Sequence, residues 1–167
     1  MATEQLSVIF GVMNKFVERI AIGVTLATHG HLVSKPAEGG TPVDTGWARS
    51  NWVPRMGKPF EGTAGSRPDK IRDFNAHAVG MSATIVGGKI DEGPQKDGVA
   101  SISGYRLGIG NLFVTNNVPY IGRLNAGSSK QAPRGFVERA ILRAITEDLK
   151  KGLKGTPFEG PNTDLIR

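Results

Sequence analysis

The chain has 167 residues, no cysteine and a formal net charge of +6. This length predicts one domain with a core of useful size, and the lack of cysteine excludes a disulfide framework and thiolate chemistry. Only 38% of the residues are hydrophobic, and the 23 glycines and 10 prolines require long loops. We therefore expect the chain to gain part of its stability from neighbouring subunits.

The N-terminal segment predicts one long amphipathic helix over residues 3–34. Its apolar residues recur at intervals of three and four and form a continuous stripe, which comprises Leu6, Ile9, Phe10, Met13, Phe16, Val17, Ile20 and Val24. The segment has no basic start, and Lys15 and Glu18 lie within it. It therefore predicts neither a signal peptide nor a membrane-spanning helix. We expect the helix to end before Pro36.

The segment TPVDTGWARSNW, residues 41–52, follows a flexible exit from this helix. Asp44 or Thr45 can cap a short helical turn within it, because their side-chain oxygens accept hydrogen bonds from free backbone N–H groups. Gly46 permits the close approach of another backbone. The segment therefore predicts a short, tightly packed turn.

Both tryptophans of the chain, Trp47 and Trp52, lie in this segment with Arg49 between them. Two interpretations stay open. The indoles either pack in the core or in a hinge, or they join Arg49 as anchors of an interface, where tryptophan and arginine are enriched.

The middle of the chain alternates short regular segments with loops rich in glycine and proline. The expected elements are a brief edge strand over residues 52–56, a loop over 57–70, a helix over 71–86, a loop over 87–98, and two short strands over 99–102 and 112–115. Together they predict an α+β fold, in which a small antiparallel sheet packs with a long N-terminal helix, a middle helix and a long C-terminal helix.

The stretch NLFVTNNVPYIGRLNAGSSKQAPRGF holds a strand, a short helix, a loop and the start of the final helix, with little slack. Tyr120 and Leu124 have the spacing that would fix the short helix to the core, and Gly127 ends that helix. Pro133 can open the final helix, expected over residues 134–151, because its missing N–H would be unpaired there in any case.

The polar loop Ser129–Lys130–Gln131 separates the two helices. It is either a contact with another subunit or ring, or the connection that sets the angle of the final helix. Residues 1–154 are expected to form the single domain. Residues 155–167 are too rich in glycine and proline for a regular element, so we expect an extended or flexible C-terminal arm.

A search for catalytic and cofactor motifs returns none. The histidines His29, His31 and His77 lack the spacing of a shared metal site, because helical residues two apart point to different sides. There is no G-x-S-x-G or P-loop motif, and Gly108 and Gly110 precede a strand instead of following it. A small hydrolase would need residues that the sequence does not display. The sequence therefore predicts no enzyme activity, no cofactor and no metal.

The basic charge favours contact with nucleic acid or with an acidic partner. However, the lysines and arginines are spread along the chain, and no segment alternates basic and aromatic residues as a base-stacking surface does. The alternative function is therefore a basic nucleic-acid-binding accessory protein, which would bind DNA with a steep dependence on salt.

Two motifs resemble those of a known family. The first resembles the pattern TPVDTG-x-L-x-x-S-W at Thr41, Pro42, Val43, Asp44, Thr45, Gly46, Ser50 and Trp52. The second resembles TNN-x-PYA-x-x-LE-x-GTSKQAP-x-GFV at Thr115, Asn116, Asn117, Pro119, Tyr120, Leu124, Gly127, Ser129, Lys130, Gln131, Ala132, Pro133, Gly135, Phe136 and Val137. On these residues the chain resembles the tail completion, or head-to-tail joining, proteins of long-tailed bacteriophages, a group that includes minor tail protein Z-like and neck proteins.

The resemblance implies a structural virion protein without catalysis, assembled in the host cytoplasm. It implies a homo-oligomeric ring, expected to be a hexamer, at the neck of the virion. The expected partners are a head-closure or connector protein on one side and the tail tube or tail terminator protein on the other, with no membrane. The net charge of +6 would serve acidic neighbours or DNA that passes through the channel.

The chain departs from the family pattern at two places. Ala48 and Arg49 stand where the family has a basic residue followed by leucine, and Asn125 replaces the usual glutamate. The second departure removes a charge that could pair across subunits, so that contact is not expected here.

Overall fold

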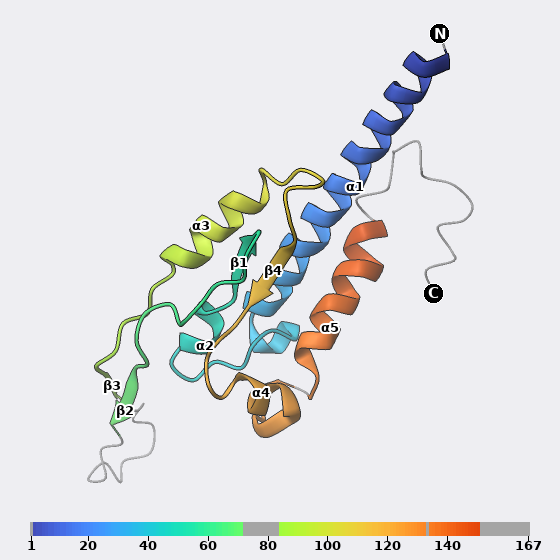
Figure 1. The fold of residues 1–167 in the computed structure, drawn as a ribbon. Coiled ribbons are helices and arrows are strands. Elements are labelled where there is room, and N and C mark those ends of the chain that lie inside the picture. Colours follow the sequence, from blue (N-terminus) through green and yellow to red (C-terminus); the bar gives the residue numbers. More distant parts are fainter. Residues whose placement is uncertain (1, 72–83, 133, 151–167) are drawn as a thin grey trace.

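The chain folds as an α+β protein in the computed structural model, which describes residues 2–71, 84–132 and 134–150. Helix α1 (Ala2–Val33) is the longest element, and strands β1 (Val53–Met56) and β4 (Leu112–Thr115) pack against it (Figure 1). Helix α3 (Gly93–Ile102) covers β1, whereas helix α5 (Phe136–Arg143) packs along α1. The predicted fold class is confirmed.

Helix α1 ends where the sequence predicts. Lys35 has an extended backbone ahead of Pro36, with φ −63° and ψ 147°, as expected for a residue that precedes proline. A 3-10 turn, Pro36–Glu38, then reverses the chain. The backbone N–H of Thr41 donates to the Leu32 carbonyl oxygen at 3.0 Å, so the returning chain pairs a carbonyl that the helix end would leave unpaired.

Strands β1 and β4 form an antiparallel pair in which Val53 lies opposite Thr115 and Met56 lies opposite Leu112. Both strands were predicted, but their partners were not. The strand predicted over residues 99–102 is wrong, and so is the second half of the loop predicted over 87–98, because residues 93–102 form α3. Residues 87–92 belong to no helix or strand, as predicted.

The packing of α3 explains the error. A short apolar run cannot be assigned to a strand or to a buried helix by periodicity alone. Ile102 is fully buried, and Gly98 lies against β1 so closely that a Cβ there would overlap the Pro54 carbonyl oxygen. The glycine that was taken for a loop residue therefore lets the helix approach the strand.

The helix predicted over residues 71–86 is also wrong at both ends. Asp69–Ile71 forms strand β2 and Thr84–Val86 forms strand β3, which pair antiparallel with Asp69 opposite Val86. Residues 72–83, which carry most of the supposed helical stripe, lie outside the described residues.

The second motif forms the expected short helix. Helix α4 (Ile121–Arg123) continues into a π-helical turn, Leu124–Ser128, in which Gly127 has a φ of 92°. Helix α5 begins at Phe136, with Gly135 (φ 74°) as its N-cap, and continues as a π-helical segment, Ala144–Asp148. Pro133 and the predicted C-terminal arm, residues 155–167, lie outside the described residues.

The core consists of two adjoining clusters. The first joins Leu32 of α1 to Trp52, Phe136 and Ala140. The second contains Trp47, Ala48 and Val118 of the two motifs. Ile121 and Leu124 pack against both clusters, so the short helix of the second motif links the two parts of the core as its spacing predicted.

Candidate functional site

The two motifs lie far apart in the sequence but meet in the fold. Asn116 Nδ2 donates to the Ala48 carbonyl oxygen at 2.7 Å. The backbone N–H of Val43 donates to Gln131 Oε1, also at 2.7 Å. The rings of Trp47 and Tyr120 pack at a tilt, with their centroids 6.1 Å apart. The motifs therefore build one continuous surface.

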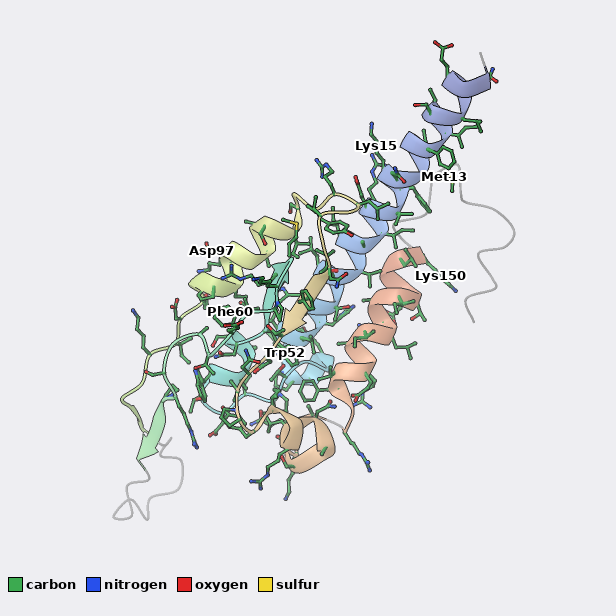
Figure 2. The ribbon with its side chains drawn as sticks, in the orientation of Figure 1. Met13, Lys15, Trp52, Phe60, Asp97 and Lys150 are labelled. Atoms are coloured by element: carbon green, nitrogen blue, oxygen red, sulfur yellow. The ribbon has the colours of Figure 1, made fainter. Side chains whose placement is uncertain are left out.

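The first motif is fixed to α1 by a chain of hydrogen bonds at its two ends. Trp52 Nε1 donates to Thr41 Oγ1 at 2.7 Å, and this hydroxyl donates to the Leu32 carbonyl oxygen at 2.7 Å. Trp52 is 6% exposed and lies in the interior of the molecule (Figure 2). Because the Trp52 N–H and the Thr41 hydroxyl each donate to an acceptor, the hydrogen bonds compensate for the burial of these groups.

Helix α2 (Trp47–Ser50) of the first motif holds a distant loop through Asn51. Asn51 is 2% exposed; its Oδ1 accepts from the Ala64 N–H at 2.6 Å, and its Nδ2 donates to the carbonyls of Trp47 and Ala64 at 2.7 and 3.1 Å. Trp47 Nε1 donates to the same Ala64 carbonyl at 3.1 Å. The site therefore consists of the two motifs and, as a third component, the backbone of the loop around residues 60–64.

The cap of α2 differs from the prediction. The N-cap is Gly46, with a φ of 85°, instead of Asp44 or Thr45. The Thr45 hydroxyl still accepts a long hydrogen bond, 3.5 Å, from the Trp47 N–H. A positive φ favours glycine because a Cβ is strained there, so this glycine sets the turn into the helix.

The second motif holds the same loop from the other side. Asn117 Nδ2 donates to the carbonyl oxygens of Phe60 and Gly62 at 2.7 and 2.9 Å. Asn116 Oδ1 accepts from the Val118 N–H at 3.1 Å and shapes the chain before Pro119, which is exposed. Asn116 therefore joins the second motif to the first motif, and Asn117 joins it to the loop around residues 60–64.

A hollow of about 440 Å³ lies where the motifs meet. Asp44, Gly46, Arg67, Tyr120, Leu124, Ser129 and Gln131 are among the residues that line it. Ser129 and Gln131 of the polar loop line the hollow, and Lys130 lies between them in the sequence. Ser129 is half-buried, and the other two residues are exposed. The Ser129 hydroxyl accepts from the Gln131 N–H at 3.2 Å and shapes the loop locally.

Charge in the hollow gathers around Tyr120. The Arg67 guanidinium lies over its ring, 5.7 Å from the centroid. Burial raises the pKa of the Tyr120 hydroxyl, the Arg67 charge partly opposes this shift, and Asp44 adds to it. The tyrosine is therefore a neutral hydrogen-bonding group at physiological pH, and the hollow can bind a polar group or a side chain of a neighbouring protein.

The departure at Asn125 has a role within the chain. Its Oδ1 accepts from the Val137 N–H at 3.0 Å, and its Nδ2 donates to both carboxylate oxygens of Glu138 at 2.9 and 3.0 Å. This donation, followed by the backbone N–H of Glu138 and the charge of Arg139, lowers the pKa of the Glu138 carboxyl. Asn125 thus accepts a hydrogen bond from the first turn of α5. A glutamate at this position would place a second carboxylate next to that of Glu138.

The predicted interface residues fall into two groups. Trp47 and Trp52 are each 6% exposed and their indole N–H groups are bonded inside the chain, which favours the core-packing interpretation over the interface assignment. Arg49 is half-buried, and Lys130 and Gln131 stand at the surface. The loop Ser129–Lys130–Gln131 and Arg49 therefore stay candidates for a contact with another subunit. Trp47 and Trp52 are buried in the core.

Sequence reasoning missed three contributors to the site, namely Asn51, Ala64 and Arg67. Asn51 lies within the first motif, so its place in a tight turn could have marked it. Ala64 contributes only backbone atoms and Arg67 belongs to a loop without periodicity, so no pattern in the sequence could have identified them.

The histidines do not gather into a site. His29 is 7% exposed in the core, His31 is half-buried and His77 lies outside the described residues. Within the described part of the chain, no three residues of the metal-binding types come together, and no helix is long and apolar enough to cross a membrane.

We expect His29 to make stability depend on pH. Burial lowers the pKa of its imidazole, and a hydrogen bond to the Trp52 backbone only partly offsets this. The His29 imidazole therefore takes up a proton near its ordinary pKa of about 6.5 in the unfolded chain, and only at a lower pH in the folded chain. Stability should fall as the pH drops from 7 to 5, and this contribution should be absent above pH 7.

Urea unfolding of the wild type and of His29→Asn across this pH range tests the effect. The asparagine cannot titrate, so the variant should lose part of the slope, whereas His31→Gln on the same helix serves as the control. A slope that is equal in the wild type and in His29→Asn would contradict the assignment.

No family model, curated protein or solved structure matches the chain.

Proposed function

We propose that the protein is a structural subunit of a ring at the head–tail junction of a long-tailed bacteriophage. The ring joins the head-closure or connector protein to the tail tube or tail terminator protein and lets DNA pass. The proposal begins from the two motifs that resemble those of tail completion proteins. We expect six subunits in the ring.

The observation that carries the proposal is the convergence of these motifs on one surface. Their hydrogen bonds pair Val43 with Gln131 and Ala48 with Asn116, both at 2.7 Å. Two separated motifs that resemble one family and also build one surface have a common structural task. The hollow between them, which the exposed Gln131 lines and next to which Lys130 is exposed, provides a preformed place for a neighbouring protein.

The geometry gives this surface little freedom. Asn51, Asn117 and Trp47 hold the loop next to it through backbone carbonyls of Phe60, Gly62 and Ala64. A contact surface that is already ordered loses little conformational entropy on binding. Such a surface suits a ring component, which must meet its neighbours at a fixed rotation for the ring to close.

Antibody labelling of virions tests the proposal. In a bacteriophage that encodes this chain, gold-labelled antibody should mark the head–tail junction. A stop codon in the gene should give DNA-filled heads and separate tails, and the wild-type protein supplied in trans should restore joined virions. Absence of the protein from virions would contradict the proposal. Tight DNA binding by the purified protein, with a steep salt dependence, would favour a nucleic-acid-binding protein instead.

A further inference from the structure

The N-terminal half of α1 projects beyond the body of the protein (Figure 1). The loop after α3 reaches the helix at Glu18, whose Oε1 accepts from the Leu107 N–H at 2.9 Å. Before this residue the helix carries seven exposed apolar side chains, which are Leu6, Val8, Ile9, Phe10, Val12, Met13 and Val17. Figure 2 shows Met13 on this free end, away from the sheet and α5. We call these seven residues the α1 patch.

Six residues of the α1 patch form one surface. At about 100° per residue, Leu6, Ile9, Phe10, Met13 and Val17 lie on one side of the helix and Val12 borders them, whereas Val8 lies toward the opposite side. The exposed fractions of the seven residues run from 43% to 67%, with Phe10 at 60%. Six adjoining side chains that each expose about half of their surface form a patch of several hundred square ångströms, a size that marks an interaction site on a soluble protein.

The charges around the patch select the kind of partner. Residues 2–17 carry only Glu4 and Lys15, so this end of the helix has no net charge. A helix that lies on a membrane surface has a polar face rich in lysine and arginine, and a nucleic-acid contact needs a basic stripe. The patch has neither, which leaves the apolar surface of another protein as the matching partner.

The same chain carries a second exposed apolar surface. Ile141, Leu142 and Ile145, on the outward side of α5 and its π-helical continuation, are 43%, 58% and 37% exposed. Phe136, Ala140 and Ala144 on the opposite side are buried. We call the three exposed residues the α5 patch. It is the largest cluster of exposed apolar side chains on this helix within the described residues.

We propose that the α1 patch of one copy packs against the α5 patch of the next copy, as a head-to-tail contact within the ring. Leu6, Ile9, Phe10, Met13 and Val17 span an arc of about 100° on α1, which is the width of the apolar stripe that one packed neighbour covers. A contact between two different patches on identical chains is heterologous, and such contacts close into a ring when the rotation permits.

A stable interface buries about 800 Å² on each partner. We expect the α1 patch and the smaller α5 patch to form the apolar centre of such an interface, and the polar side chains around them to form its rim. The expectation that a chain with 38% hydrophobic residues gains part of its stability from neighbouring subunits points the same way. The inference rests on the proposed ring, and it specifies which surfaces the subunits use.

Single charge substitutions in the full-length chain test the contact. Native mass spectrometry and light scattering should find the wild type in closed oligomers. Phe10→Glu on α1 and Leu142→Glu on α5 should each weaken association at least about 100-fold, because each buries a charge in an apolar contact. Ser7→Glu, which adds the same charge on the polar side of α1, should leave assembly unchanged. Circular dichroism checks that all variants keep their helices.

Mixing the two defective variants distinguishes a contact between α1 and α5 from a contact between two α1 helices. Phe10→Glu keeps an intact α5 patch and Leu142→Glu keeps an intact α1 patch, so together they should form a one-to-one pair that grows no further. Assembly of Leu142→Glu alone would indicate α1–α1 pairing and overturn the proposal. So would a wild-type chain that stays monomeric at every concentration, or a Phe10→Glu chain that still assembles.

Cross-linking gives a second readout, because the chain contains no cysteine. Chains that carry Met13→Cys should form disulfides with chains that carry Leu142→Cys, and neither should cross-link to itself. A truncation after Lys150 should leave this cross-link intact. Loss of assembly in the truncated chain would show that residues 151–167 supply the contact, contrary to the proposal.

The two levels of inference fail in different ways. A protein that forms these cross-links but is absent from virions would refute the neck function and keep the α1–α5 contact. A protein that marks the neck in virions but assembles despite Phe10→Glu and Leu142→Glu would refute the contact and keep the function.

Discussion

Replacement of Asn51 by alanine is expected to lower the free energy of unfolding by about 2–5 kcal/mol, because a buried N–H loses its partner and two buried carbonyls each lose one of their donors. The Ala64 N–H and the carbonyls of Trp47 and Ala64 would all lose a hydrogen bond to the Asn51 side chain. The site is 2% exposed, so water cannot replace these bonds without opening the loop. Chemical denaturation of the variant measures the loss.

Asn117→Ala is the matched control. Asn117 also bonds two carbonyls of the same loop, those of Phe60 and Gly62, but its side chain is exposed. Water can take over these bonds, so the expected cost is below about 1 kcal/mol. Equal losses in the two variants would show that burial does not decide the energetics of this loop.

Replacement of Phe136 by alanine is expected to cost about 3–5 kcal/mol, as is usual when a fully buried aromatic side chain leaves a cavity. Phe136 is 0% exposed and packs with Leu32, Trp52 and Ala140, so one ring joins α1, the first motif and α5. We expect a lower melting temperature and a lower denaturant midpoint with an unchanged fold.

Phe60→Ala provides the comparison for the same chemical change. Its ring is half-buried and lies under the Arg55 guanidinium at 5.5 Å. We expect a loss of about 1 kcal/mol there, from partial burial and the cation–π contact. A Phe136→Ala protein as stable as Phe60→Ala would mean that the cluster around α5 is not the centre of the core.

The parts of the fold that could be predicted are those with a repeated pattern. The apolar spacing of three and four marked α1 and α5, and the Leu112–Thr115 run marked β4. The 99–102 stretch failed because a four-residue apolar run fits a strand as well as the last turn of a helix. The close approach of α3 to β1 at Gly98 distinguishes the helix from a strand. This approach is a tertiary contact, which the local sequence does not reveal.

The site was predictable to a similar extent. The two motifs marked segments that meet in the fold, and the position of Leu124 between the core clusters agrees with its spacing. The role of the two tryptophans stayed open because core and interface use the same residue type. Their burial follows from partners, such as Thr41 and Ala64, that no local pattern specifies.

The loop around Phe60–Ala64 is held by its main chain, so its side chains can change without loss of these contacts. The side chains that hold this loop, those of Asn51, Asn117 and Trp47, bind its main-chain atoms. The side chains of Lys58, Glu61 and Thr63 stand in solvent. A fixed backbone with freely exchangeable side chains is the arrangement that antibodies use in their binding loops. New partner preferences could therefore be introduced by substitution at these three positions, while the scaffold beneath them keeps its shape.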